Sequence, residues 1–273
     1  LLYDPGTSHG RKSLELDERL TTGETELLEH MEIHSFRLKP GEESSCLNLY
    51  QTRQPTILGA TRRTIARGGF RFVGADVENP WTLLEQDPEM VEMDSGKTIP
   101  VYPVIGDMNT LQYSLHKSVG QTISIPNDEA PRLQLKIVGM LDASVFQGVL
   151  VMSAVRFQQA FPDNSGFSYF LVADSRYGAT GQKPGNLDAL TATRGNQVTL
   201  LESRLREYGF DAEPVVERLG RFLAVQNTYL MTFQVLGGLG LLLGTVGLAT
   251  VMLRNVLERR SELALLRAIG FRQ

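Results

Sequence analysis

The stretch of residues 222–253, which holds no charged side chain, is the feature that most constrains how this chain can fold. About 20 predominantly apolar residues suffice for a helix to cross the hydrocarbon core of a bilayer. The alternative is a helix buried in the core of a soluble protein, but such helices rarely reach this length. Over the whole chain, 42% of the residues are hydrophobic and 21% are charged. This composition is typical of a globular chain with at most one or two membrane spans.

A longer helix is predicted around this stretch. Pro214 is tolerated in the first turn of a helix, and apolar residues recur at helical spacing from residue 215 into the uncharged stretch. A continuous helix over residues 214–259 would be about 65 Å long, roughly twice the thickness of the hydrocarbon core. The sequence therefore predicts a stalk and membrane helix over residues 214–257. A break with unpaired backbone groups near Asn227 would contradict this prediction.

Glycines recur along one face of the predicted helix. They are Gly237, Gly240, Gly244 and Gly247. The steps of three and four residues place them on the same side, and Gly240 with Gly244 matches the GxxxG pattern that lets two membrane helices approach closely. The alternative is compositional, because glycine is generally more frequent in membrane helices than in soluble ones. We expect this glycine face to pack against another helix.

Arginines flank the predicted span unequally. Arg254, Arg259, Arg260, Arg267 and Arg272 follow it, whereas Arg218 and Arg221 are the nearest before it. The excess of positive charge after the span predicts that the C-terminal end is cytoplasmic and that residues 1 to about 221 are extracytoplasmic. The net charge is −4, and the five Arg and two Glu after residue 221 leave the preceding part more acidic still. Such an acidic body argues against general nucleic-acid binding.

The residues before the span predict an α+β domain over residues 1–213, because short extended runs alternate irregularly with short helical patterns. The expected strands are residues 33–38, 70–73, 101–105, 122–125, 133–141, 149–152 and 167–173. The expected helices are residues 109–117, 153–161 and 187–208. Asn109 and Ser153 are expected as N-caps. Residues 1–29 are interpreted as a connector or surface excursion, and residues 177–185 as a loop.

Partial matches to catalytic motifs all lack an essential residue. The sequence Gly96-Lys97-Thr98 ends like a phosphate-binding loop, but Val91 replaces its first glycine. His30 and His34 are spaced as in a zinc-protease helix, but no glutamate follows His30 directly. The nucleophile-elbow pattern around Ser168 lacks its second glycine. We therefore predict no catalytic and no metal-ligating residue, and we do not expect the chain to be an enzyme.

The segment after the span, residues 258–272, combines a charged turn, a short amphipathic helix and a glycine stop. Its apolar residues can offer a ridge to the groove of a partner or to the lipid interface. The segment closely resembles the motif that follows the second membrane helix of the MacB/FtsX-like ABC transporter permeases. This family includes macrolide exporters, lipoprotein-release permeases and the cell-division protein FtsX. The resemblance implies a cytoplasmic coupling helix that docks on the ATPase through Glu262, Leu263, Leu265, Leu266, Arg267, Ala268 and Gly270.

A weaker resemblance extends upstream. Residues 103–107, 111–115, 118–125 and 136–141 look like the successive strand, short helix, turn with strand, and strand of the family's extracytoplasmic domain. The resemblance covers residues from about 100 to 273, is best over 101–175, and is poor over 1–100. It implies a domain like the MacB periplasmic core over residues 1–213, followed by the stalk and membrane helix and by a truncated coupling helix over residues 258–273.

The resemblance also implies a function. A permease subunit in the bacterial cytoplasmic (inner) membrane would couple ATP hydrolysis in a separate ATPase subunit to movement of the outer domain. The cargo would be a lipid, lipoprotein, peptide or drug-like substrate, exported or extracted from the bilayer. ATP and magnesium would bind the ATPase, so no cofactor is expected in this chain.

The implied partners are the ATPase, the bilayer, a second permease copy or half, and possible envelope proteins. Family members have at least four spans and one is visible here, which suggests a chain cut at both ends. The alternative is a non-transporting, FtsX-like regulator whose outer domain binds a partner protein. A membrane-anchored hydrolase would need catalytic residues that the sequence does not offer.

Overall fold

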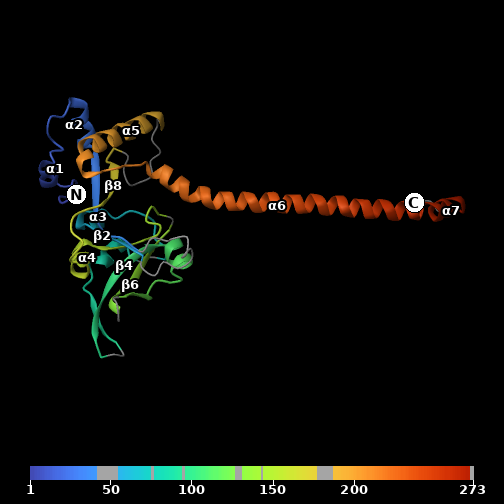
Figure 1. Ribbon diagram of the computed structural model, residues 1–273, viewed down its shortest axis with the longest axis horizontal. Coiled ribbons are helices and arrows are strands. Elements are labelled where there is room, and N and C mark those ends of the chain that lie inside the picture. Colours follow the sequence, from blue (N-terminus) through green and yellow to red (C-terminus); the bar gives the residue numbers. More distant parts are fainter. Residues whose placement is uncertain are drawn as a thin grey trace. The chain divides into compact units, whose positions relative to one another are not determined.

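The computed structural model describes residues 1–41, 55–74, 77–93, 96–126, 131–142, 144–176 and 187–270. The predicted loop at residues 177–185 lies outside these ranges. The chain divides into two compact units, Leu1–Glu213 and Pro214–Gln273 (Figure 1). The first unit is a mixed α/β domain, and the second consists of the helices α6 and α7.

An eight-stranded sheet organises the described part of the first unit. Its order is β5-β6-β4-β7-β2-β1-β8, and β3 pairs with β4 beside this path. The strands are β1 (Met31–Lys39), β2 (Thr56–Ala60), β3 (Glu89–Glu92), β4 (Thr98–Asp107), β5 (Thr122–Pro126), β6 (Pro131–Leu141), β7 (Val149–Ser153) and β8 (Tyr169–Asp174). The β2–β7 and β4–β6 pairs are parallel, whereas the remaining pairs are antiparallel. The sheet is therefore mixed.

Eight helical segments accompany this sheet in the described part of the first unit. They are α1 (Ser8–Ser13), α2 (Thr22–Glu29), α3 (Arg62–Arg67), η1 (Pro80–Glu85), η2 (Thr110–Ser114), α4 (Ala154–Ala160), α5 (Leu187–Arg204) and η3 (Arg206–Tyr208). Ser153 caps α4, because its side chain accepts a hydrogen bond from the backbone N–H of Arg156, as predicted. Thr21 and Glu24 form a reciprocal capping box at the start of α2.

Two buried apolar clusters join strands of the first unit to its helices. The larger one joins the central strands to α4, with Val104, Leu135, Ile137, Leu150 and Phe157 fully buried. A second cluster lies where α2 and α5 pack together beside β1 and β8 (Figure 1). Its buried members are Leu28, Met31, Ile33, Leu200 and Leu201. The second cluster attaches the last helix of the domain to the end of the sheet.

Several predicted elements differ from the observed ones. Residues 70–73 are not a strand, since only Phe72 forms an isolated bridge, to Leu141. The preceding Gly68 and Gly69 take positive φ angles, which interrupt an extended run. Residues 1–29 are not a plain connector, because they form α1 and α2.

The helix predicted at residues 109–117 is a single π-helical segment, η2. Asn109 occupies the N-cap position of η2, as predicted, but its side chain makes no capping hydrogen bond. Its own backbone is helical, and its N–H donates to the carboxylate of Asp107 at 2.9 Å. The Asp107 side chain thus takes the role that the sequence suggested for Asn109.

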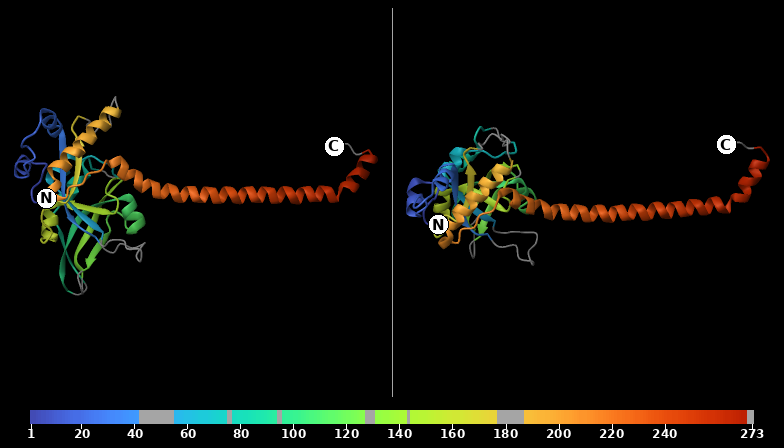
Figure 2. Two further views of the ribbon diagram at one scale, coloured as in Figure 1. Left: turned by 45° about the horizontal axis from the view of Figure 1, so that its top comes forward. Right: turned by 90° about the horizontal axis from the view of Figure 1, so that it is seen from above.

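The second unit contains one long helix. α6 (Val215–Glu258) runs without a break through Asn227, and Pro214 occupies its N-cap position (Figure 2). The predicted continuity of this helix is confirmed. Its 44 residues correspond to about 65 Å. After Arg259 the chain turns into α7 (Arg260–Ala268).

Candidate functional site

An apolar window in α6 is the first part of the candidate site. Among the described residues, only the segment Leu230–Glu258 forms a helix long and apolar enough to cross a membrane, with a mean hydropathy of 2.0. Within its own unit the helix leaves leucine, valine and methionine side chains exposed on every face. A soluble core helix would instead bury one face or all of them. The segment is a candidate membrane helix.

The glycine face lies within this window. An added Cβ on Gly237, Gly240, Gly244 or Gly247 would meet no described atom within 4 Å, so no residue that the structure describes requires glycine there. Each glycine in a helix interior costs about 0.5–1 kcal/mol relative to alanine. The structure thus places the four glycines on one uninterrupted helix, and no packing among the described residues explains them.

The helix α7 is the second part of the candidate site. Leu265 and Ile269 are about 70% exposed and Leu266 is 43% exposed. Leu266 and Ile269 are three residues apart and therefore share one face of the turn. Gly270 has φ +90°, the left-handed conformation that ends helices, as the predicted glycine stop requires. Ala268 is also exposed.

The other residues expected to dock are only partly described. Glu262, Leu263 and Arg267 lie on the α7 backbone, but their side chains are outside the described part of the structure. α7 therefore brings all the expected docking residues except Gly270 onto one short helix, and Gly270 follows it. Its described leucines have no partner that would bury them.

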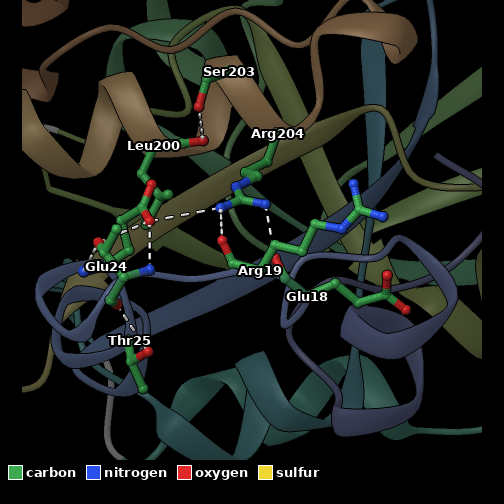
Figure 3. Close-up of polar contacts among 8 residues, drawn as sticks. Glu18, Arg19, Glu24, Thr25, Leu200, Ser203 and Arg204 are labelled. Carbon is green, nitrogen blue, oxygen red and sulfur yellow. Dashed lines mark hydrogen bonds and ion pairs between the residues drawn. The ribbon is translucent and has the colours of Figure 1, made fainter.

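The third part of the candidate site is the end of α5, which sequence analysis missed. The Arg204 guanidinium reaches the segment between α1 and α2 (Figure 3). Its Nη1 donates to the carbonyl oxygen of Glu18 at 2.8 Å, and its Nη2 donates to that of Arg19 at 3.1 Å. Nη2 also lies 3.6 Å from Oε2 of Glu24. Arg204 thus joins the end of α5 to the start of α2.

The electrostatic state of Glu24 follows from its contacts. Hydrogen bonds from the backbone N–H and the hydroxyl of Thr21 lower the pKa of Glu24, and the charge of Arg204 adds to this effect. Glu24 is therefore ionised at neutral pH, both as half of the capping box and as the anion facing Arg204.

Apolar contacts flank Arg204. Leu205 is fully buried with Leu14 and Leu16, and Phe210 packs against this cluster and also against the cluster of α2, α5 and β1. The Phe210 ring lies 5.3 Å from that of Phe170 in β8. The residues between α5 and Pro214 are thus attached to both the helix and the sheet.

Polar bonds complete this attachment. Oε1 of Glu202 accepts a hydrogen bond from the Ala212 N–H at 3.1 Å. Gln197 in α5 donates to the Asp174 carboxylate at the end of β8, at 2.8 Å. Hydrogen bonds from Arg176 lower the pKa of Asp174 and keep it ionised. We refer to Arg204 with these contacts as the α5 anchor.

The histidine pair noted in the sequence does not form a metal site. His34 is buried, its Nδ1 lies 3.3 Å from the Thr64 hydroxyl, and its Nε2 lies 3.8 Å from Glu32. Burial lowers the pKa of His34, and the charges of Arg67 and Arg63 lower it further. In the part of the chain that the structure describes, no three His, Cys, Asp or Glu side chains are grouped as metal ligands.

Neither a protein-family model nor a curated protein matches the chain. Solved structures similar to it include the extracellular domain of the noncanonic ABC-type transporter YknZ from Gram-positive bacteria, with 12% identity over 63% of this chain and 74% of that one, and a TM-score of 0.29. Another is the periplasmic region of MacB from Actinobacillus actinomycetemcomitans, with 7% identity over 63% of this chain and 65% of that one, and a TM-score of 0.32. Both TM-scores are low, so the function has to be inferred from the residues of this chain.

Proposed function

We propose that this chain is part of a permease-type subunit of an ABC transporter, in which a folded outer domain, a stalk and membrane helix and a cytoplasmic docking helix act in series. The observation that supports this most directly is α6, a helix of 44 residues without a break. It connects a folded domain at one end to the exposed apolar face of α7 at the other. The resemblance of residues 258–272 to a coupling helix supports the same assignment.

A continuous helix is suited to transmitting displacement. About 30 Å of hydrocarbon core would be crossed by about 20 residues, so roughly half of α6 would extend beyond the core. Because every backbone group inside a helix is hydrogen-bonded to its own chain, such a helix resists bending unless its ladder is interrupted. Movement at α7 would therefore reach residues 205–213 and the domain.

The candidate residues have separate roles in this proposal. The face of α7 that contains Leu266 and Ile269 docks on a cytoplasmic ATPase, together with the remaining residues expected from the resemblance. The glycine face of α6 packs against a second copy of the subunit or a second half. The more positive C-terminal end lies in the cytoplasm of a bacterium, and residues 1 to about 221 lie outside the inner membrane.

The proposed chemistry belongs to the partner. ATP and magnesium would bind the ATPase, and this chain would supply positioning and movement. An apolar or amphiphilic cargo, such as a lipid, lipoprotein, peptide or drug-like molecule, suits a transporter that exchanges material with the bilayer.

The test is to determine topology and partnership together in the full-length protein. In a protein whose native cysteines, Cys46 included, are replaced by serine, the exposed Tyr113 in the first unit or Ile269 after α7 would be replaced by cysteine. Each single-cysteine protein would then be treated with a membrane-impermeant thiol reagent in intact cells. We expect labelling at position 113 alone, and co-purification of a P-loop ATPase that cross-links to position 269. Labelling of both positions, or of position 269 alone, would refute the topology. Capture of an envelope enzyme without an ATPase would favour the regulator.

A further inference from the structure

We propose that Arg204 is a positioning residue that locks the segment between α1 and α2 to the end of α5, so that the segment and the residues leading into α6 move as one body. The proposal rests on the proposed function for its mechanical meaning. The locking itself is a property of the first unit alone.

The geometry at Arg204 is directional. Its guanidinium fork makes two hydrogen bonds to successive carbonyl oxygens and faces a carboxylate, at the distances given above. The leucine clusters on either side are non-directional, and on their own they would permit sliding. Arg204 therefore fixes the register between the two segments, a role that a point charge such as lysine fulfils poorly.

The bonded segment has an unusual backbone. Arg19 and Glu15 take φ angles of +51° and +55°, a left-handed conformation that is unfavourable for L-residues. Such conformations persist only when the surroundings hold them. The two hydrogen bonds from Arg204 are made to Arg19 and its neighbour Glu18, so removing the guanidinium removes two contacts that hold this backbone in place.

The position of Arg204 is consistent with a mechanical role. Its side chain is only 23% exposed and that of Glu24 is 32% exposed, so this contact is better shielded than a typical surface ion pair. α2 leads through His30 directly into β1, and α5 is bonded to β8, the neighbour of β1. A displacement entering through residues 205–213 thus reaches two adjacent strands along two routes, and Arg204 joins those routes.

Two spin labels on the full-length protein in lipid nanodiscs measure this locking. Cys46 and any further native cysteine are replaced by serine, and labels are attached at Glu26→Cys in α2 and at Tyr208→Cys, both of which are exposed. We expect a narrow distance distribution in the parent protein and a broad one in Arg204→Ala. The matched control is Arg206→Ala, which removes an exposed arginine two residues away and should leave the distribution narrow.

Hydrogen exchange gives a second readout. In Arg204→Ala, the amides of residues 14–29 should exchange about tenfold faster or more, since hydrogen bonds to a charged group are lost, whereas those of β4 and β6 should be unaffected. Glu24→Gln keeps the capping-box bonds but loses the charge, so it should have a smaller effect than Arg204→Ala. Uniformly faster exchange, or no change in either readout for Arg204→Ala, would overturn the proposal.

Measuring the label distances with and without ATP distinguishes a failure of this proposal from a failure of the proposed function. With the ATPase and ATP bound, the distance between the labels at positions 26 and 208 should stay constant in the parent protein, while position 208 moves relative to position 113. In the Arg204→Ala protein, the distance between positions 26 and 208 should change when ATP binds. Absence of any ATP-dependent movement would refute the proposed function, and the resting distributions would still decide the locking. A nucleotide-dependent change between positions 26 and 208 in the parent would refute the locking.

Discussion

Replacing Leu266 with aspartate tests whether α7 docks on an ATPase. Leu266 is 43% exposed in this chain, so its substitution should leave the first unit folded. Full burial of a leucine contributes about 1.5–3 kcal/mol, so covering the exposed part would contribute about 1 kcal/mol. A carboxylate at the same place would lose this contribution and would also be desolvated, at a cost of several kcal/mol.

The expected result follows from these values. Docking should weaken by at least about 100-fold, since each 1.4 kcal/mol corresponds to a factor of ten. Binding of the purified ATPase to the full-length protein in nanodiscs, followed by stimulation of ATP hydrolysis, measures the effect. Ala264→Asp is the matched control, because it adds the same charge at an exposed position on the side of α7 opposite Leu266, and Ala264 is not an expected docking residue. Equal binding by the Leu266→Asp and Ala264→Asp proteins would refute docking through this face.

The other predictions concern α6, the α5 anchor and the buried histidine. Gly244→Ile should lower the self-association of the protein in detergent by about tenfold, measured by sedimentation. Gly238→Ile changes an equally open glycine on a different face of α6 and should have little effect. Equal effects of the two substitutions would exclude a specific glycine face. Leu205→Ala should lower the free energy of unfolding by about 2–5 kcal/mol in urea titrations, because Leu205 is fully buried. A loss below about 1 kcal/mol would contradict its role in the cluster with Leu14 and Leu16. The pKa of His34 is lowered from 6.5, so the unfolded chain binds the proton more readily and stability should fall as the pH drops from 6.5 through the folded pKa. His34→Gln should weaken this dependence in urea titrations between pH 7 and pH 5, and an unchanged slope would show that other groups cause it.

Local patterns in the sequence predict much of the first unit. The expected strands at residues 33–38, 101–105, 122–125, 133–141, 149–152 and 167–173 each overlap an observed strand, because alternating or continuous apolar runs determine them locally. α4 and α5 also agree with the predicted helices. The confirmed length of α6 follows from the same kind of local information, since an uncharged helical run needs no distant partner to be recognised.

The missed strands depend on distant partners. β2 is five residues long, contains Gly59 and pairs in parallel with β7, almost 100 residues later in the chain. β3 is exposed along its whole length and is defined only by its pairing with β4. β2 is too short, and β3 too exposed, for a local pattern to identify either as a strand, so only the assembled sheet reveals them.

The α5 anchor was missed for a related reason. Thr21 and Glu24, followed by Leu27 and Leu28, form a sequence signature of a helix start, and it could have identified α2. The contact of Arg204 with Glu18 spans 186 positions in the chain, and no periodicity predicts such a pair. The contact of residues 1–29 with α5 therefore follows only from the packing of α2 against α5.

The distribution of glycines along α6 connects the two mechanical requirements of the proposed function. The part of α6 outside the bilayer has to stay helical in water, where each glycine costs about 0.5–1 kcal/mol and exposes the backbone. Inside the hydrocarbon core, an unsatisfied backbone group costs several kcal/mol, so the helix stays intact despite its glycines. The glycine face lies entirely within the apolar window, and Gly220 is the one glycine before it in α6. Close packing of α6 in the bilayer is thus compatible with a helix that continues without a break beyond it.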